Sequence, residues 1–110
     1  MALVYYHQKK YGKAQELFDR SLMIRKDVLG EKHPFVAESN IRLAELYDIQ
    51  GDYHKALFYF FEAYKIWIYR LGLRHSETQS AYKKMEKTYL ECNPEGNFEQ
   101  WLEAKLKESD

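Results

Sequence analysis

The sequence predicts an all-α fold in which antiparallel helical hairpins stack as a short solenoid of about five helices. Three observations predict it: the chain repeats itself at a shift of forty-two residues, its apolar residues recur every three or four positions, and its glycines stand singly in short turns. The repeat is plainest at LGEKHP, residues 29–34, which returns as LGLRHS at 71–76. A chain of 110 residues is long enough for one domain with its own core.

The first copy of the repeat covers residues 1–32. Met1 falls where a complete copy would already be midway through its first helix, which is typical of a fragment of a longer array. We therefore expect a partial repeat here. Its residues find identical partners forty-two positions later: Tyr5 and Tyr47, Tyr11 and Tyr53, Ala14 and Ala56, Phe18 and Phe60, Ile24 and Ile66.

The second copy covers residues 33–74 and is complete. Its apolar spacing predicts one helix over 36–50 and a second from Tyr53 to about Tyr69. Gly51 ends the first of these helices, and a connection this short makes the two helices antiparallel neighbours. In the turn before this copy, Gly30 stops the preceding helix and Pro34 fits the first turn of the next one.

The third copy is degenerate and, with a terminal helix, covers residues 75–110. Ser76 followed by Gln79 three residues later is typical of a capping box at a helix start. The apolar stripe near the end of the chain predicts a terminal helix that caps the stack; it consists of Phe98, Trp101, Leu102 and Leu106. The three copies are therefore expected to form a single domain over 1–110.

The stretch LAELYDIQGDYHKALFYFFEAYKI at 43–66 resembles a tetratricopeptide repeat, and the forty-two-residue period ending in LG-x-x-H resembles the kinesin light chain subgroup of that family. The family's signature positions are filled by Ala44, Tyr47, Gly51, Tyr53, Ala56, Phe60 and Ala63. The resemblance implies a right-handed solenoid. It also implies a non-catalytic scaffold for protein–protein interaction, which binds a peptide or a partner protein in the concave groove of the first helices.

The resemblance further implies which residues meet the partner in that groove: Tyr6, His7, Ile41, Arg42, Glu45, Asp48, Lys83, Lys84 and Lys87. The three lysines favour a partner with acidic residues, unless they are simply solvated. Ile41 and Arg42 stand where the kinesin light chain subgroup usually has paired asparagines. The resemblance therefore carries over the scaffold and leaves the ligand open.

A second surface is apolar on the outward face of the second helix of the complete copy, at Leu57, Phe58, Phe61 and Ile68. An exposed stripe of this size usually marks an interface. The alternative function is therefore a dimerisation or regulatory segment of a larger multidomain protein, with a homodimer formed through residues 57–68. The competing interpretation is that the C-terminal helix folds back over the stripe.

Composition argues against several classes of partner. Seventeen basic and seventeen acidic residues cancel, so no overall field attracts nucleic acid or an anionic membrane surface. No run of apolar residues in the sequence reaches the eighteen or so that a membrane-spanning helix needs. Because Cys92 is the single cysteine, no internal disulfide can form, which favours a reducing compartment, expected to be the cytoplasm.

The four histidines do not indicate an enzyme. His33 and His75 are one repeat apart, which in stacked hairpins means on the order of 10 Å, too far to share one metal ion. No histidine has a partner at a ligand spacing such as HExxH, and the isolated glycines form no phosphate-binding loop. We therefore expect no catalytic residue, no metal and no cofactor.

Overall fold

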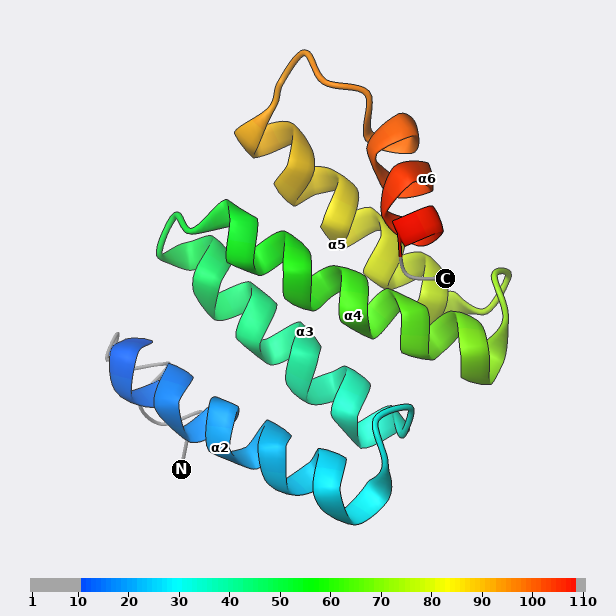
Figure 1. Ribbon diagram of the computed structural model, residues 1–110. Helices are drawn as coiled ribbons and strands as arrows, with labels where there is room; N and C mark the ends of the chain where they lie inside the picture. The colour runs from blue at the N-terminus through cyan, green and yellow to red at the C-terminus, as the bar shows by residue number, and fades with distance from the viewer. Residues whose placement is uncertain (1–10, 109–110) are drawn as a thin grey trace.

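The computed structural model describes residues 11–108, and in that range the chain forms five α-helices and no strand. They are α2 (Tyr11–Leu29), α3 (Pro34–Ile49), α4 (Tyr53–Leu71), α5 (Ser76–Cys92) and α6 (Phe98–Glu108). Neighbouring helices run antiparallel, with the hairpin of α3 and α4 in the middle of the stack (Figure 1). The expected all-α repeat fold is confirmed. None of these five helices is long and apolar enough to cross a membrane.

Within residues 11–108, a histidine caps both helices that open a repeat, α3 and α5. The backbone N–H of Phe35 donates a hydrogen bond to His33 Nδ1 at 3.1 Å, and the N–H of Glu77 donates to His75 Nδ1 at 3.2 Å. These bonds satisfy donors that the first turn of a helix leaves without an intrahelical partner. The recurring histidines therefore start α3 and α5.

From the sequence we predicted that Ser76 caps the start of α5, and this prediction is wrong. His75 holds the capping position with extended backbone, and Ser76 is already the first residue of the helix. Pro34 lies at the first turn of α3, as predicted. Gly72 ends α4 with a φ of 85°, a left-handed value that glycine adopts without steric cost.

The core extends from α3 across α4 to α5 and α6, and its closest helix packing is between α3 and α4. Small residues alternate there with large ones, which lets the two helix axes approach closely while the larger side chains fill the remaining space. The small residues are four fully buried alanines, Ala37, Ala44, Ala56 and Ala63. The large buried ones include Val36, Leu43 and Phe60, while Tyr64 lies beside Tyr82 of α5 on the other side of α4, with ring centroids 6.0 Å apart.

The C-terminal helix α6 covers part of the outer face of α4. Leu57 and Phe61 are 5% and 7% exposed, and the ring of Phe61 lies 6.3 Å from that of Trp101 between centroids. The expectation that these two residues form an exposed stripe is wrong, because the terminal helix folds back over them. Ile68 is half-buried against the core, and only Phe58 remains largely exposed, at 55%.

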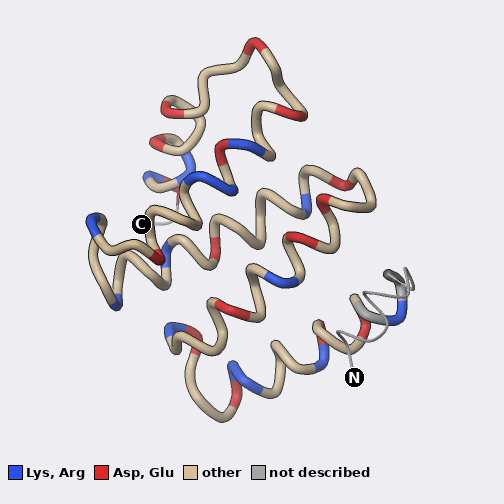
Figure 2. The backbone as a smooth tube through the Cα atoms, turned by 180° about the vertical axis from the view of Figure 1, so that it is seen from behind, with Lys and Arg blue, Asp and Glu red and all other residues tan. Residues whose placement is uncertain are grey.

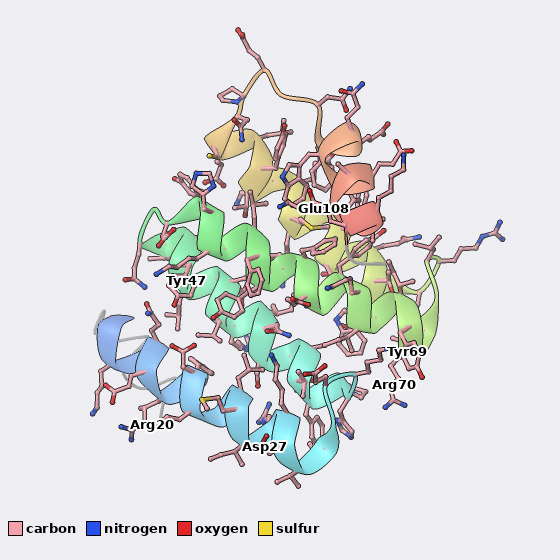
Figure 3. The ribbon with its side chains drawn as sticks, in the orientation of Figure 1. Arg20, Asp27, Tyr47, Tyr69, Arg70 and Glu108 are labelled. Carbon is pink, nitrogen blue, oxygen red and sulfur yellow. The ribbon has the colours of Figure 1, made fainter. Side chains whose placement is uncertain are left out.

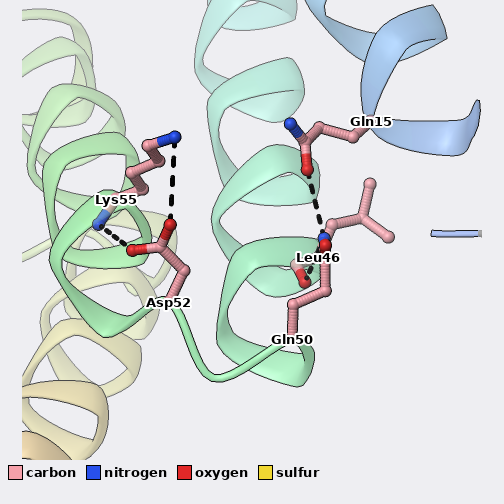
Figure 4. Close-up of polar contacts among 5 residues, drawn as sticks. All are labelled: Gln15, Leu46, Gln50, Asp52 and Lys55. Atoms are coloured by element: carbon pink, nitrogen blue, oxygen red, sulfur yellow. Dashed lines mark hydrogen bonds and ion pairs between the residues drawn. The ribbon is translucent and has the colours of Figure 1, made fainter. Parts of the chain in front are cut away.

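A polar contact ties α2 to the turn between α3 and α4 (Figure 4). Gln50 Nε2 donates to Gln15 Oε1 at 3.1 Å and to the carbonyl of Leu46 at 3.2 Å. Across the same turn, the N–H of Lys55 donates to Asp52 Oδ1 at 3.4 Å and caps α4. The hydrogen bond between Gln15 and Gln50 thereby fixes α2 against the α3–α4 hairpin at this end of the stack.

Candidate functional site: a partner-binding groove

Two adjoining pockets form a groove across α2, α3 and α5. One pocket, of about 250 Å³, lies between α3 and α5, and the other, of about 140 Å³, lies between α2 and α3. Both are lined by Glu38 and Arg42, so the groove is continuous. We define the groove by its lining residues: Phe18, Ser21, Arg25, Glu38, Ser39, Ile41, Arg42, Trp67, Glu77, Ser80, Ala81 and Lys84.

The groove brings together some of the residues that the sequence assigned to it. Ile41, Arg42 and Lys84 line it. Glu45 reaches it through ion pairs with two of these residues. The other assigned residues on α3 and α5, Asp48, Lys83 and Lys87, do not line either pocket, and the predictions for Tyr6 and His7 fall outside residues 11–108.

Sequence reasoning missed several lining residues, and some had a usable signal. Glu38 and Ser80 are forty-two residues apart, as Arg42 and Lys84 are, and each lies one helical turn before its neighbour. Extending the predicted face by one turn would have found them. Trp67 comes from α4, a second helix of a repeat, from which no groove residue was predicted.

Glu45 joins the two walls of the larger pocket. Its Oε1 lies 3.5 Å from Arg42 Nη1 within α3, and its Oε2 lies 3.6 Å from Lys84 Nζ on α5. These are partly exposed pairs, each worth less than about 1 kcal/mol. Both cations that line this pocket, Arg42 and Lys84, are nevertheless paired with Glu45, a carboxylate of the chain itself.

Arg25 connects α2 to the start of α3. Its Nη1 donates to the carbonyl of Phe35 at 3.0 Å and to Ser39 Oγ at 2.8 Å. The guanidinium also lies 5.7 Å from the ring centroid of Phe35. The charge at this end of the groove is therefore held by hydrogen bonds to α3.

Asp48 lies one turn further along α3, among charges from α5. Burial raises the pKa of its carboxyl group, and Glu91 raises it further, while Lys87 and a hydrogen bond from Thr88 oppose the rise. Lys87 therefore acts on an acidic group of the neighbouring helix. Seen from behind, basic and acidic positions are interspersed along both α3 and α5 (Figure 2).

A larger pocket lies elsewhere on the described chain. It measures about 540 Å³ and is lined by the end of α2, the following turn, α3, α4 and Leu106 of α6. Two contacts beside it hold the turn onto α4: Arg70 Nε donates to the carbonyl of Lys32 at 2.7 Å, and Lys32 Nζ lies 4.2 Å from the ring centroid of Tyr69. Tyr69 and Arg70 project at the end of α4 beside that turn (Figure 3). We therefore assign this pocket a structural role.

The two inter-repeat histidines, His33 and His75, act as helix caps. His33 and His75 use Nδ1 as acceptors for backbone N–H groups. Across residues 11–108, no three His, Cys, Asp or Glu side chains are grouped so that they could hold a metal ion. The arrangement of the groove suits recognition of another chain through pockets, charges and an aromatic wall.

Comparison with known families matches residues 1–68 to the tetratricopeptide repeat. The matched range includes α2, α3 and most of α4, while α5 and α6 follow it. None of the curated proteins matches the chain in sequence.

Proposed function

The chain belongs to the tetratricopeptide repeat family, and on this basis we propose that it is a non-catalytic scaffold that binds a peptide or a segment of a partner protein in the groove across α2, α3 and α5. Members of this family typically mediate protein–protein interactions. The groove itself, as the site of binding, is supported by one observation above all: two pockets on one face are joined through shared walls. Helical repeat scaffolds commonly bind partners on extended surfaces of this kind.

The lysines of α5 support a partner that carries acidic residues at one end. Lys84 is paired with Glu45, so this contact falls to Lys83 and Lys87, which are exposed on the same helix. Exposed charges at the margin of a groove mainly steer association and fix the direction of the bound chain. We place binding in the cytoplasm, because a lone, half-buried Cys92 suits a reducing compartment.

The repeat length supports membership of the kinesin light chain-like subgroup. Both LG-x-x-H turns put their histidine at the start of the next helix, so the motif has one structural role in both copies. Ile41 and Arg42, which replace the usual paired asparagines, line the groove. The ligand is therefore proposed from the lining residues of this chain and not from the subgroup.

Self-association through the stripe of residues 57–68 loses its main support. Two of its four residues are buried beneath α6, and Ile68 is half-buried. Phe58 alone is a small apolar area of the kind that monomeric proteins commonly expose. We therefore propose that the partner binds in the groove and not through this stripe.

A matched pair of substitutions on α5 tests the proposal. Ser80 is exposed and lines the larger pocket, whereas its exposed neighbour Gln79 does not line either pocket of the groove. In capture of a library of randomised octapeptides, Ser80→Tyr should lower binding about tenfold, which corresponds to the loss of one well-buried contact. Gln79→Tyr adds the same ring outside the groove and should bind as the unaltered chain does. Equal capture by both variants would refute the groove as the binding site.

A further inference from the structure

The positive and negative charges of the groove are not equally engaged. Arg42 and Lys84 are both paired with Glu45, and Arg25 is hydrogen-bonded to α3. By contrast, within the part of the chain that the structure describes, the side chains of Glu38 and Glu77 make no ion pair and no hydrogen bond. The charges left available to a partner in the groove are therefore negative.

Both of these carboxylates line the same space, the pocket of about 250 Å³ between α3 and α5. Glu38 comes from the first turns of α3 and Glu77 from the first turn of α5, so they approach the pocket from opposite helices. Ile41 and Trp67 also line it, and Trp67 is 7% exposed. The pocket thus combines an apolar wall with two carboxylates from facing helices.

We propose that this pocket binds a lysine or arginine side chain of the partner, an inference that rests on the groove being the binding site. A long basic side chain has an aliphatic stem and a charged head, which match the apolar wall and the carboxylates in turn. An acidic side chain would instead meet two carboxylates without an ion-pair partner, and would have to displace Glu45 to reach a cation.

The proposal also gives the bound segment a direction. The basic side chain enters near the starts of α3 and α5, while Lys83 and Lys87 lie further along α5. A segment with a basic residue at one end and acidic residues at the other satisfies both surfaces. The reversed segment would place like charges together at both ends, which disfavours that orientation.

The test uses the full chain and an octapeptide library in which one central position is fixed as Arg, Lys, Leu or Glu. The unaltered chain should capture the Arg and Lys sets best. Glu38→Gln with Glu77→Gln should reduce that preference about fivefold, as expected for the loss of two partly screened charge contacts. The control is Glu95→Gln with Glu99→Gln, which removes the same charge from exposed positions outside the groove, one of them also in the first turn of a helix.

Fluorescence locates the bound residue. In a Trp101→Phe background the remaining tryptophan is Trp67, which lines the pocket, whereas Trp101 does not. An Arg-fixed peptide set should change Trp67 emission, and the change should be lost with Glu38→Gln and Glu77→Gln. A Leu-fixed set captured at equal total concentration should leave it nearly unchanged.

The outcomes separate this inference from the proposed function. If Ser80→Tyr lowers capture as expected but the Arg and Lys sets show no advantage, the groove stands and the basic-residue pocket is overturned. A preference for the Glu set, or one for basic residues that survives the double glutamine variant, overturns it equally. If Ser80→Tyr leaves capture unchanged, both the groove and the pocket fail.

Discussion

His33 and His75, forty-two residues apart, are the N-caps of α3 and α5, a position that serine or asparagine more often fills. His33 Nδ1 accepts a hydrogen bond from the backbone N–H of Phe35. The rings of His33 and Phe35 are also in contact, with centroids 4.9 Å apart. The residue therefore has two distinct stabilising roles, one polar and one apolar. Substitution can separate them, because aspartate keeps the acceptor and lacks the ring.

We predict that His33→Ala lowers the free energy of unfolding by about 1 kcal/mol, the usual cost of losing a helix cap. His33→Asp should restore most of that loss, since a carboxylate is a strong acceptor at this position and interacts well with the helix N-terminus. Urea unfolding followed by circular dichroism measures both variants. If aspartate is as destabilising as alanine, the contact with Phe35 and not the cap is what His33 contributes.

At the scale of helices, α2 and α4 are the second helices of successive repeats, and they differ in how far neighbouring helices cover them. Ile24 of α2 and Ile66 of α4 occupy the same repeat position, yet Ile24 is 62% exposed and Ile66 is 6% exposed. Ile66 belongs to the core formed by the α3–α4 hairpin. Ile24 has no such cover from any residue between 11 and 108. Identity within a repeat therefore does not fix burial, because burial depends on the neighbouring helix.

This pair provides its own control for a stability measurement. Ile66→Ala should cost about 3 kcal/mol, because it removes buried methylene groups and leaves a cavity in close-packed surroundings. Ile24→Ala should change stability by less than about 1 kcal/mol, because the side chain is already largely in water. Chemical denaturation of both variants at one protein concentration makes the comparison. A large loss with Ile24→Ala would mean that α2 is covered in solution.

Periodicity was sufficient to predict the helices, and much less of the groove. The second helix of the complete copy was predicted from Tyr53 to about Tyr69 and extends to Leu71. Arg42 and Lys84 were assigned to the groove and line it. Their pairing with Glu45 could not be foreseen, because it depends on side-chain distances across α3 and α5. The repeat pattern shows which side chains share a face, but not which charges neutralise one another.

For the molecule as a whole, the decisive feature is where the last helix lies. An apolar stripe on α4 and another on α6 were both visible in the sequence, and either could have been matched to a second chain. In the structure they are matched to each other, with Phe61 beside Trp101 and a small pocket of about 140 Å³ between α4 and α6. The terminal helix thus covers apolar surface that the stack would otherwise expose.

Neighbouring phenylalanines on α4 test this closure. Phe61→Ala should lower the free energy of unfolding by about 3 to 4 kcal/mol, because the ring is buried beneath α6. Phe58→Ala should cost less than about 1 kcal/mol, because that ring is mostly exposed. Urea unfolding measures both, and light scattering over a range of concentrations accompanies it. If both substitutions cost little and the unaltered chain gains mass with concentration, α6 does not cover α4 in solution, and the stripe is a contact between copies. Unequal costs with a constant mass establish that α6 covers it.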